Sequence, residues 1–398
     1  MNNDAKKLAG SKEPLVRIVK KSSATMKQKV IVRAASIVLA LIIDAAFIVL
    51  VTGLNPLAVY REIFKATFET PLRFMWMLRD LVALLCIGIA LAPAFKMRFW
   101  NIGAEGQVLM GGFATAICMM YLGGKLPTPL LFLTMFLTSV IAGAVWSFIP
   151  AFFKANWNTN ETLFTLMMNY VAIQLVSYYT NIWRGQASSL GTINMGTKIG
   201  WFPKMFGHDF TLNIIIVAVL TVLMYVYLKY TKHGYEISVV GESEKTAKYA
   251  GINVKKVTIR TLILSGAICG LCGFIIVAGN KHTIATNTAG GNGFTAIIVA
   301  WLSKFNTFFM ALIAFLLVFL EKGASQIAST YGLNEYIADI ISGIILFCIL
   351  GSEFFINYKL LFRHKSENKE EKNDSVKHSR MDRPRHSVRY DNHVRLNG

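Results

Sequence analysis

Separate apolar runs of membrane length recur along this 398-residue chain and restrict the folds open to it. A helix needs about 20 predominantly apolar residues to cross a bilayer. The chain is 54% hydrophobic and 16% charged, whereas a soluble domain carries charge on about a quarter of its residues. The sequence therefore predicts an all-α, polytopic membrane protein with about ten transmembrane or partly spanning helices. The expected segments are residues 30–53, 72–94, 101–122, 129–153, 161–183, 212–230, 257–279, 290–303, 307–321 and 336–353.

Basic residues gather in three polar regions, an N-terminal arm (1–29), a loop (231–256) and a C-terminal tail (357–398). With these regions, the short link 96–98 and the adjoining ends of the membrane segments in the cytoplasm, about 31 of the 41 lysines and arginines fall on that side, as the positive-inside rule requires. We therefore expect both termini inside, a membrane domain over 30–356, and a disordered tail, which has few apolar residues. The net charge of +19 then reflects membrane orientation and not nucleic-acid binding. The tail either contacts anionic lipid headgroups or is simply solvated.

A polar motif stands at the head of the third apolar segment. Residues 101–107 read Asn-Ile-Gly-Ala-Glu-Gly-Gln, so a carboxylate, two amides and two glycines precede an apolar run. Glu105 inside a membrane costs about 2.5–3.5 kcal/mol or more unless protein, water or a partner compensates it. The glycines permit close backbone approach, and the amides can donate and accept in a cavity. Asn101, Glu105 and Gln107 are therefore candidates for a substrate pathway, with a structural hinge near the inner mouth as the alternative.

Two further amides lie in a similar membrane context. Asn169 falls two turns into an otherwise apolar helix, where an amide needs a polar partner. Asn292 belongs to the glycine-rich stretch 289–294, which fits a broken or re-entrant membrane helix. Such half-helices commonly present backbone groups to substrates in transporters. Both amides join the candidate substrate pathway.

An acid and two thiols in the apolar segments have plainer interpretations. Asp44 lies alone in the first segment, and a partner on a neighbouring helix is favoured over a substrate role. Cys269 and Cys272 form a CxxC, but the small residues around it favour close helix packing over metal or redox chemistry. No second Cys/His pair accompanies the CxxC, so no metal site is predicted.

The polar loop 231–256 contains a short helical stretch suited to contact with a soluble partner. Residues 243–250 have helical character, and Gly251 follows as a helix C-terminal glycine. A compact helix between two membrane spans can dock in a groove. An ordinary solvated connection is an equal interpretation on composition alone.

No catalytic constellation stands out in the sequence. The seven histidines form no cluster of ligands or catalytic groups, and neither GxGxxG nor GxxxxGK[ST] occurs. The chain is therefore expected to hold no ATP site of the P-loop kind and not to be an enzyme. A membrane-embedded enzyme or scaffold, and a channel, are the alternatives from other classes.

Motifs along most of the chain carry a family resemblance. They are Phe99 to Gln107, Trp146 to Pro150, Asn160 with Glu161, Leu166 to Tyr170, Gly241 to Ile252, Ser265 to Ala267, Gly270 to Gly273, Gly291 to Phe294 and Ile298 to Ala300. In order and spacing they resemble integral-membrane permeases of ATP-binding-cassette importers, in the branch with ribose-type and branched-chain amino acid permeases. The resemblance covers about residues 54–355, and 99–107 resembles the signature of nucleoside and simple-sugar permeases. Residues 301–304 (Trp-Leu-Ser-Lys) and the long basic tail depart from that pattern.

This resemblance implies a permease subunit that binds no cofactor itself. Its implied partners are a cytoplasmic ABC ATPase that uses ATP, an external substrate-binding lipoprotein, and a related second permease in a heterodimer, all at a bacterial plasma membrane. Loop 231–256 becomes the coupling segment, with coupling residues Gly241, Glu242, Ala247, Ala250 and Gly251. The expected cargo is nucleosides, purine nucleosides first, with simple sugars of the ribose or galactose type as the alternative.

Overall fold

The computed structural model describes residues 16–20, 25–205, 207–208 and 210–362. The chain forms two compact units, one of residues 1–40 with 347–398 and one of residues 41–346. Most of the predicted N-terminal arm (1–29) and C-terminal tail (357–398) lies outside the described residues.

A short two-stranded sheet belongs to the first unit. Strand β1 (Val16–Lys20) pairs antiparallel with β2 (Tyr358–Phe362), and Val16 lies opposite Phe362. Both segments contain β-branched or aromatic residues, which favour extended pairing. The first residues of the tail predicted to be disordered therefore form a paired strand.

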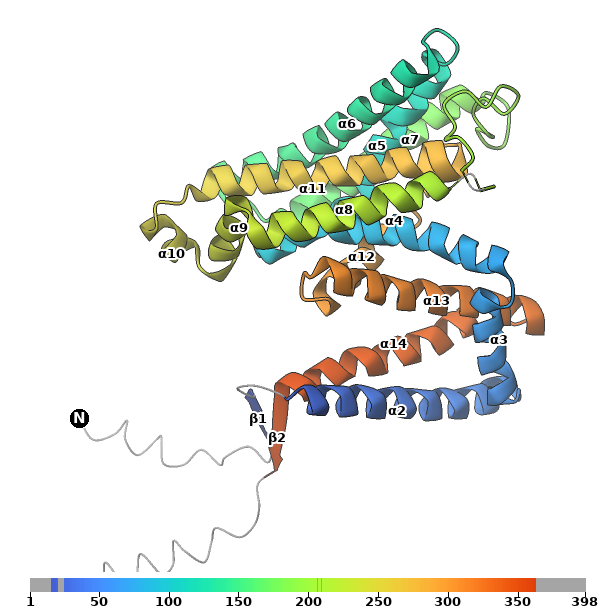
Figure 1. Cartoon of the computed structure of the whole chain (residues 1–398), viewed down its shortest axis with the longest axis vertical. Helices are drawn as coiled ribbons and strands as arrows, with labels where there is room; N and C mark the ends of the chain where they lie inside the picture. Colours follow the sequence, from blue (N-terminus) through green and yellow to red (C-terminus); the bar gives the residue numbers. More distant parts are fainter. Residues whose placement is uncertain (1–15, 21–24, 206, 209, 363–398) are drawn as a thin grey trace, which may run out of the picture. The chain divides into compact units, whose positions relative to one another are not determined.

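The described residues otherwise form α-helices and one π-helical turn (Figure 1). They are α2 (Met26–Thr52), α3 (Pro56–Phe68), α4 (Pro71–Lys96), α5 (Ala104–Tyr121), α6 (Thr128–Trp157), α7 (Glu161–Arg184), α8 (Thr211–Tyr230), α9 (Lys232–Glu242), α10 (Glu244–Tyr249), α11 (Val254–Ile276), the π-helical turn η1 (Val277–Lys281), α12 (Asn292–Leu302), α13 (Thr307–Tyr331) and α14 (Glu335–Asn357).

Seven helices in the described part of the chain are long and apolar enough to cross a membrane. They are α2, α4, α6, α8, α11, α13 and α14. Helices α5 and α7 have 18 and 24 residues but carry acidic and amide side chains, and α12 is a shorter apolar helix of 11 residues. The predicted class, an all-α polytopic membrane protein, is confirmed.

Several predicted segments extend further in the structure, and α6 and α14 each run four residues beyond the expected ends at 153 and 353. Helix α11 is continued by η1, so the segment expected over 257–279 reaches Lys281. Helix α13 runs to Tyr331, whereas the apolar pattern predicted an end at 321. Helix α13 continues because Lys322, which interrupts the apolar pattern, is paired with Asp80 on α4.

Helices α5, α6 and α11 pack closely at glycines in the second unit. A Cβ added to Gly270 of α11 would collide with the Ser139 carbonyl of α6, and one on Gly111 of α5 would collide with Gly270. Small residues at such contacts let helix backbones approach in a membrane protein. The three helices therefore form a tight core.

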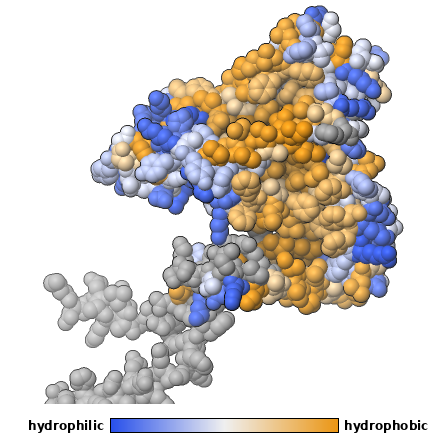
Figure 2. Space-filling view, viewed as in Figure 1, coloured by the Kyte–Doolittle hydropathy of each residue, from blue (hydrophilic) through white to orange (hydrophobic). Residues whose placement is uncertain are grey.

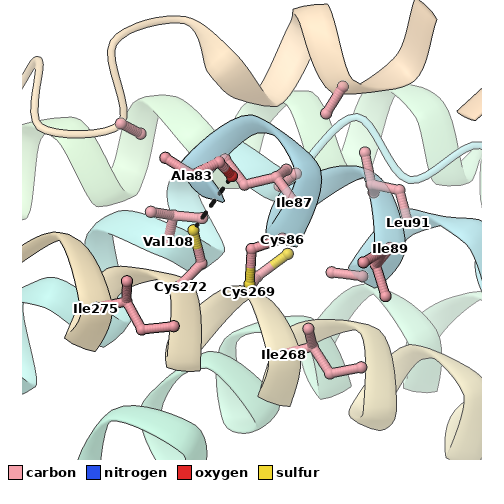
Figure 3. Packing of buried hydrophobic residues seen from close by; sticks show 14 of the residues in the cluster. Ala83, Cys86, Ile87, Ile89, Leu91, Val108, Ile268, Cys269, Cys272 and Ile275 are labelled. Atoms are coloured by element: carbon pink, nitrogen blue, oxygen red, sulfur yellow. Dashed lines mark hydrogen bonds between the residues drawn. The ribbon is translucent and has the colours of Figure 1, made fainter. Parts of the chain in front are cut away.

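The predicted CxxC lies in this packed region. Figure 3 shows Cys269 and Cys272 of α11 facing Cys86 of α4 among isoleucine and leucine side chains, and Cys272 Sγ lies 3.6 Å from the Ala83 carbonyl oxygen. All three thiols are buried. The surroundings support the packing interpretation of the CxxC.

Polar surface gathers at opposite ends of the second unit. Helices α9 and α10 lie at one end of its long helices, and the loop after α7 lies at the other (Figure 1). Figure 2 shows hydrophilic surface over the α9–α10 end and largely hydrophobic surface over the helices between the ends. This distribution is the one expected of helices that cross a bilayer.

The long loop after α7 is held to neighbouring elements by several contacts. The Trp201 ring stacks on His282 with centroids 3.9 Å apart, and the Ile193 N–H donates to the His282 carbonyl at 2.8 Å. Asn194 Nδ2 donates to the Met119 carbonyl of α5 at 2.9 Å. The loop therefore forms an ordered cover over η1 and the end of α5.

We predict that Gly270→Ala destabilises the helix core. The added methyl group would meet the backbone of α6, and overpacking of this kind costs about 1–3 kcal/mol. Thermal unfolding of the detergent-solubilised protein should show a lower midpoint for this variant. Gly343→Ala in α14 is the matched control, because nothing lies within 4 Å of its added Cβ. Equal midpoints for the two variants would contradict the close packing.

Candidate functional site

The Glu105 carboxylate joins the first turn of α5 to the start of α12. Its Oε1 accepts the Gly291 N–H at 2.8 Å, and its Oε2 accepts the Gly293 N–H at 2.8 Å. Glu105 is 8% exposed. A helix N-terminus presents unpaired N–H groups and a partial positive charge, which stabilise an anion. The buried negative charge is therefore compensated by the backbone of α12.

Two glycines make this contact possible. Gly291 has φ +78°, a left-handed conformation that glycine adopts without a steric cost. A Cβ on Gly293 would lie 2.6 Å from Glu105 Oε2 and 2.8 Å from the Glu105 nitrogen. The glycine-rich stretch predicted as a broken helix thus forms the N-terminus of α12 and receives the carboxylate.

The amides of Asn101 and Gln107 pair with each other. Asn101 Oδ1 accepts from Gln107 Nε2 at 3.2 Å and from the Gly103 N–H at 3.1 Å. Asn101 Nδ2 donates to Ser265 Oγ of α11 at 3.3 Å. Both amides are buried, so the pair fixes the turn before α5 against α11.

Helix α7 supplies the remaining partners of this turn. Asn169 Oδ1 accepts the Gly106 N–H at 2.8 Å, and Asn169 Nδ2 donates to the Ile102 carbonyl at 2.8 Å. Thr165 Oγ1 accepts the Ile102 N–H at 3.1 Å. Side chains of α7 therefore satisfy the Gly106 N–H in the first turn of α5 and the Ile102 N–H just before the helix, as a buried helix terminus requires.

Asn101, Glu105, Gln107 and Asn169 together form what we name the polar junction, which joins α5, α7, α11 and α12. Its members are buried, and their polar atoms bond to the protein. Asn292, the fifth pathway candidate, begins α12 and is half-buried. The contacts give the four junction residues a structural role, and a substrate role for any of the five stays a prediction.

The polar junction lies well inside the membrane-spanning part of the second unit. Ser265, the partner of Asn101, lies about 16 Å along α11 from Val254 at the rise of an α-helix. Lipid offers no hydrogen-bond partners at such a depth, so polar groups there need partners from the protein or from a water-filled cavity.

Asp44 is buried beside α3. The Tyr60 hydroxyl of α3 donates to the Leu41 carbonyl at 2.6 Å. Burial and the adjacent Asp44 charge raise the pKa of Tyr60 to about 12. Both carboxylate oxygens of Asp44 are buried without a hydrogen-bond partner among the described residues, so Tyr60 is a polar neighbour on another helix and not the bonded partner that the sequence led us to expect.

Helix α9 is attached to three long helices. Arg260 of α11 forms an ion pair with Glu236 at 2.8 Å, which holds the pKa of that carboxyl below its usual range. A Cβ on Gly241 would collide with the Lys96 carbonyl at the end of α4. Lys96 Nζ in turn donates to the Leu228 carbonyl of α8 at 3.0 Å. Helix α9 therefore has fixed contacts with α4 and α11, and α4 is fixed to α8.

Helix α10 projects from α9 with most of its surface exposed. Among the predicted coupling residues, Gly241 and Ala247 are buried, whereas Glu242, Ala250 and Gly251 are exposed. Ser243 caps the helix through the Thr246 N–H, and Gly251 follows it with φ +77°, as predicted for a C-terminal glycine. The predicted short helix is present and displays a polar face.

Sequence reasoning missed two features. Tyr249 is 92% exposed on α10, and an aromatic residue among the lysines of a short polar helix was the available signal. Asp80 of α4 and Lys322 of α13 form an ion pair inside membrane-spanning helices. Each belongs to a pair of adjacent charges in an otherwise apolar run, Arg79-Asp80 and Glu321-Lys322, and that pattern was visible in the sequence. The pairing of Asp80 with Lys322 was not.

A family model described as the permease component of the branched-chain amino acid transport system matches residues 75–350. The matched region includes the polar junction, α9, α10 and the Asp80–Lys322 pair.

Three similar proteins are named as permeases for glucose or guanosine. The glucose ABC transporter permease protein TsgB13 of Haloferax volcanii is 28% identical over 77% of this chain and 84% of its own length. The guanosine ABC transporter permease protein NupP of Bacillus subtilis is 28% identical over 77% of this chain and 89% of its own. A second Bacillus subtilis protein, the guanosine ABC transporter permease protein NupQ, is 26% identical over 52% of this chain and 67% of its own.

We predict that Glu105→Gln weakens the polar junction. The amide keeps one acceptor oxygen but turns an NH₂ group toward a backbone N–H, and hydrogen bonds to a charged group contribute about 1.5–3 kcal/mol. The unfolding midpoint of the purified variant should fall below that of Glu242→Gln, which removes an exposed carboxylate. A similar midpoint for both variants would argue against the two hydrogen bonds to α12.

Proposed function

The chain belongs to the family of branched-chain amino acid transport system permease components, and from this premise we propose that it forms part of the translocation path of an importer for nucleosides. It is a transport component without a catalytic domain, and ATP is hydrolysed by a partner ATPase. Purine nucleosides are the proposed cargo.

The main support for the proposal is helix α10, whose surface is largely exposed, next to helix α9, which is held against α4 and α11. An exposed helix of this kind fits a groove on a soluble partner. We propose that the ATPase receives α10, with Tyr249 as the anchor and Glu242, Ala250 and Gly251 around it. Aromatic anchors in pockets commonly dominate the energy of such interfaces.

A movement of α10 has a direct route to the long helices. Gly241 lies against the end of α4, and the Glu236–Arg260 ion pair joins α9 to α11. The carbonyl of Ala247, the buried residue of α10, accepts the Ile252 N–H at 2.9 Å and so ties α10 to the chain entering α11. These contacts support a coupling role for Gly241 and Ala247.

The polar junction lies next along this route, because residues 97–103 link α4 directly to α5. We propose that the junction exists in two arrangements, with the Glu105 carboxylate bonded to α12 in one of them. The ATPase and the solute then shift the balance between the arrangements. Asn101, Gln107, Asn169 and Asn292 lie beside the same contact and are the proposed polar groups near the path.

The proposed assembly has further components on both sides of a bacterial plasma membrane. A related second permease completes the path as a heterodimer, which the NupP and NupQ pair in Bacillus subtilis supports. The positive-inside rule supports a cytoplasmic position for the α9–α10 end and for both termini. An external substrate-binding lipoprotein then meets the opposite end, where the ordered loop after α7 lies.

The choice of nucleosides rests on the two guanosine-named relatives. The glucose-named relative favours simple sugars as the second candidate. Neutral, hydroxyl-bearing solutes are common to both, so uptake by cells decides between them.

We predict that cells lacking this gene lose uptake of labelled guanosine and regain it when the gene is restored. The permease is proposed to supply the path itself, so initial uptake should fall close to the background of energy-depleted cells. Labelled glucose and ribose are measured in parallel. Unchanged guanosine uptake with lost sugar uptake would replace nucleosides by sugars, and uptake that persists without ATP would favour a channel.

We predict that Tyr249→Ala reduces the amount of ATPase that copurifies with the permease and lowers uptake about tenfold or more, since loss of an aromatic anchor costs about 2 kcal/mol or more. Tyr336→Ala is the matched control, because Tyr336 is 75% exposed on α14. Normal ATPase recovery with Tyr249→Ala would exclude α10 as the docking element.

A further inference from the structure

We propose that Arg79, Asp80 and Lys322 form a contact site for a neutral, hydroxyl-rich solute inside the membrane-spanning part of the second unit. These residues are named here the α4–α13 ion cluster. The inference rests on the proposed function, because it locates a solute contact within the translocation path.

The cluster joins two helices through one carboxylate. Arg79 Nε lies 2.9 Å from Asp80 Oδ1, and Arg79 Nη2 donates to Asp80 Oδ2 at 3.4 Å. Lys322 Nζ of α13 forms an ion pair with the same Oδ2. Two cations therefore share one carboxylate, and Glu321, next to Lys322 on α13, adds a second carboxylate whose charge interacts with those of Lys322 and Asp80.

The cluster lies deep along both helices. Asp80 is about 14 Å from Pro71 at the start of α4, and Lys322 is about 14 Å from Tyr331 at the end of α13, at 1.5 Å per residue. A charge at such a depth is costly in lipid, so it faces protein or water. The three side chains nevertheless remain 28–32% exposed. Partial exposure at this depth points to a hydrated space and not to lipid.

Helices α6 and α8 provide the contrast. Each is apolar along its length and carries its basic residue, Lys154 or Lys229, in its last turn. Charge at a helix end can reach the membrane surface. Helices α4 and α13 instead carry opposite charges facing each other far from their ends, which is the arrangement expected along a polar pathway.

Lys281 is a further basic residue whose charge interacts with both the α4–α13 ion cluster and the polar junction. Its Nζ donates to the Thr288 carbonyl at 2.9 Å, and its charge interacts with those of Arg79, Asp80 and Glu105. Lys281 ends the π-helical turn η1, an irregularity often found at functional sites. Lys281 is thus a basic side chain that interacts with both the cluster and the Glu105 carboxylate bonded to α12.

The mixture of charges selects the chemical class of the solute. Asp80 accepts hydrogen bonds, and Arg79, Lys322 and Lys281 donate them, so a sugar ring with several hydroxyl groups finds both kinds of partner. An anion would meet Asp80, and a cation would meet three basic side chains. The groups are already paired with one another, so contacts with the solute are shallow and permit release.

The test uses cysteine labelling in intact cells that express the full assembly. Lys322→Cys is made in a Cys348→Ser background, because the other four native cysteines are buried. A membrane-impermeant, positively charged methanethiosulfonate is the reagent. Leu312→Cys is the matched control on the same helix, since Leu312 is 62% exposed on an apolar face.

We expect Lys322→Cys to react about tenfold faster or more than Leu312→Cys, because only a thiolate in water reacts. Saturating guanosine or glucose should slow the reaction at Lys322→Cys. Unreactive Lys322→Cys, or a reaction that neither solute slows, would overturn the inference. Arg79→Cys provides a second position should Lys322→Cys fail to reach the membrane.

Uptake by the Cys348→Ser parent separates this inference from the proposed function. If the Cys348→Ser parent transports guanosine or glucose but neither solute protects Lys322→Cys, only the proposed solute contact at the cluster is rejected. If the parent transports neither solute, the proposed function is rejected. Protection of Lys322→Cys by one solute supports the inference and identifies which of the two classes enters the path.

Discussion

A carboxylate held by two backbone N–H groups fixes the polar centre of this protein. Glu105 would be costly in a membrane as an isolated charge, and the N-terminus of α12 supplies both the hydrogen bonds and the partial charge that compensate it. The arrangement requires Gly291 and Gly293, because side chains there would prevent the approach or strain the turn. The position of α12 against α5 therefore depends on one acid and two glycines.

The rest of the second unit separates into contacts that resist movement and contacts that can exchange. At Gly270 the backbones of α6 and α11 touch, so this pair moves as a body. The polar junction is different, since each of its hydrogen bonds has a close equivalent in water or in another donor. In the proposed coupling, a displacement that enters through Gly241 at the end of α4 reaches the junction through residues 97–103. The close packing at Gly270 and the hydrogen bonds of the junction support that proposal.

The fold was largely predictable from the sequence, because membrane-spanning helices can be recognised as apolar runs of sufficient length. The α7 segment agreed within one residue, since Asn160 and Arg184 mark its ends locally. The end of α13 was missed because Lys322 is compensated by Asp80 on a distant segment. The partners of Glu105 could not be predicted from the sequence either, because they are backbone N–H groups, which every residue except proline carries. Sequence reveals which groups need partners, whereas only the fold supplies the partners.

The two kinds of intramembrane charge in this protein suggest how a polar path and a stable bundle coexist. Glu105 is buried and hydrogen-bonded to the backbone of α12, so its carboxylate has a structural role as long as α12 keeps this position. Asp80 and Lys322 are paired but remain partly exposed, so they can offer hydrogen bonds without losing each other. The charge of Lys281 interacts with those of both Asp80 and Glu105, so Lys281 links the partly exposed cluster to the buried carboxylate. A solute at the cluster would alter the field felt by Lys281 and, through it, by Glu105. We therefore propose that solute occupancy and the state of the α5–α12 contact are coupled electrostatically.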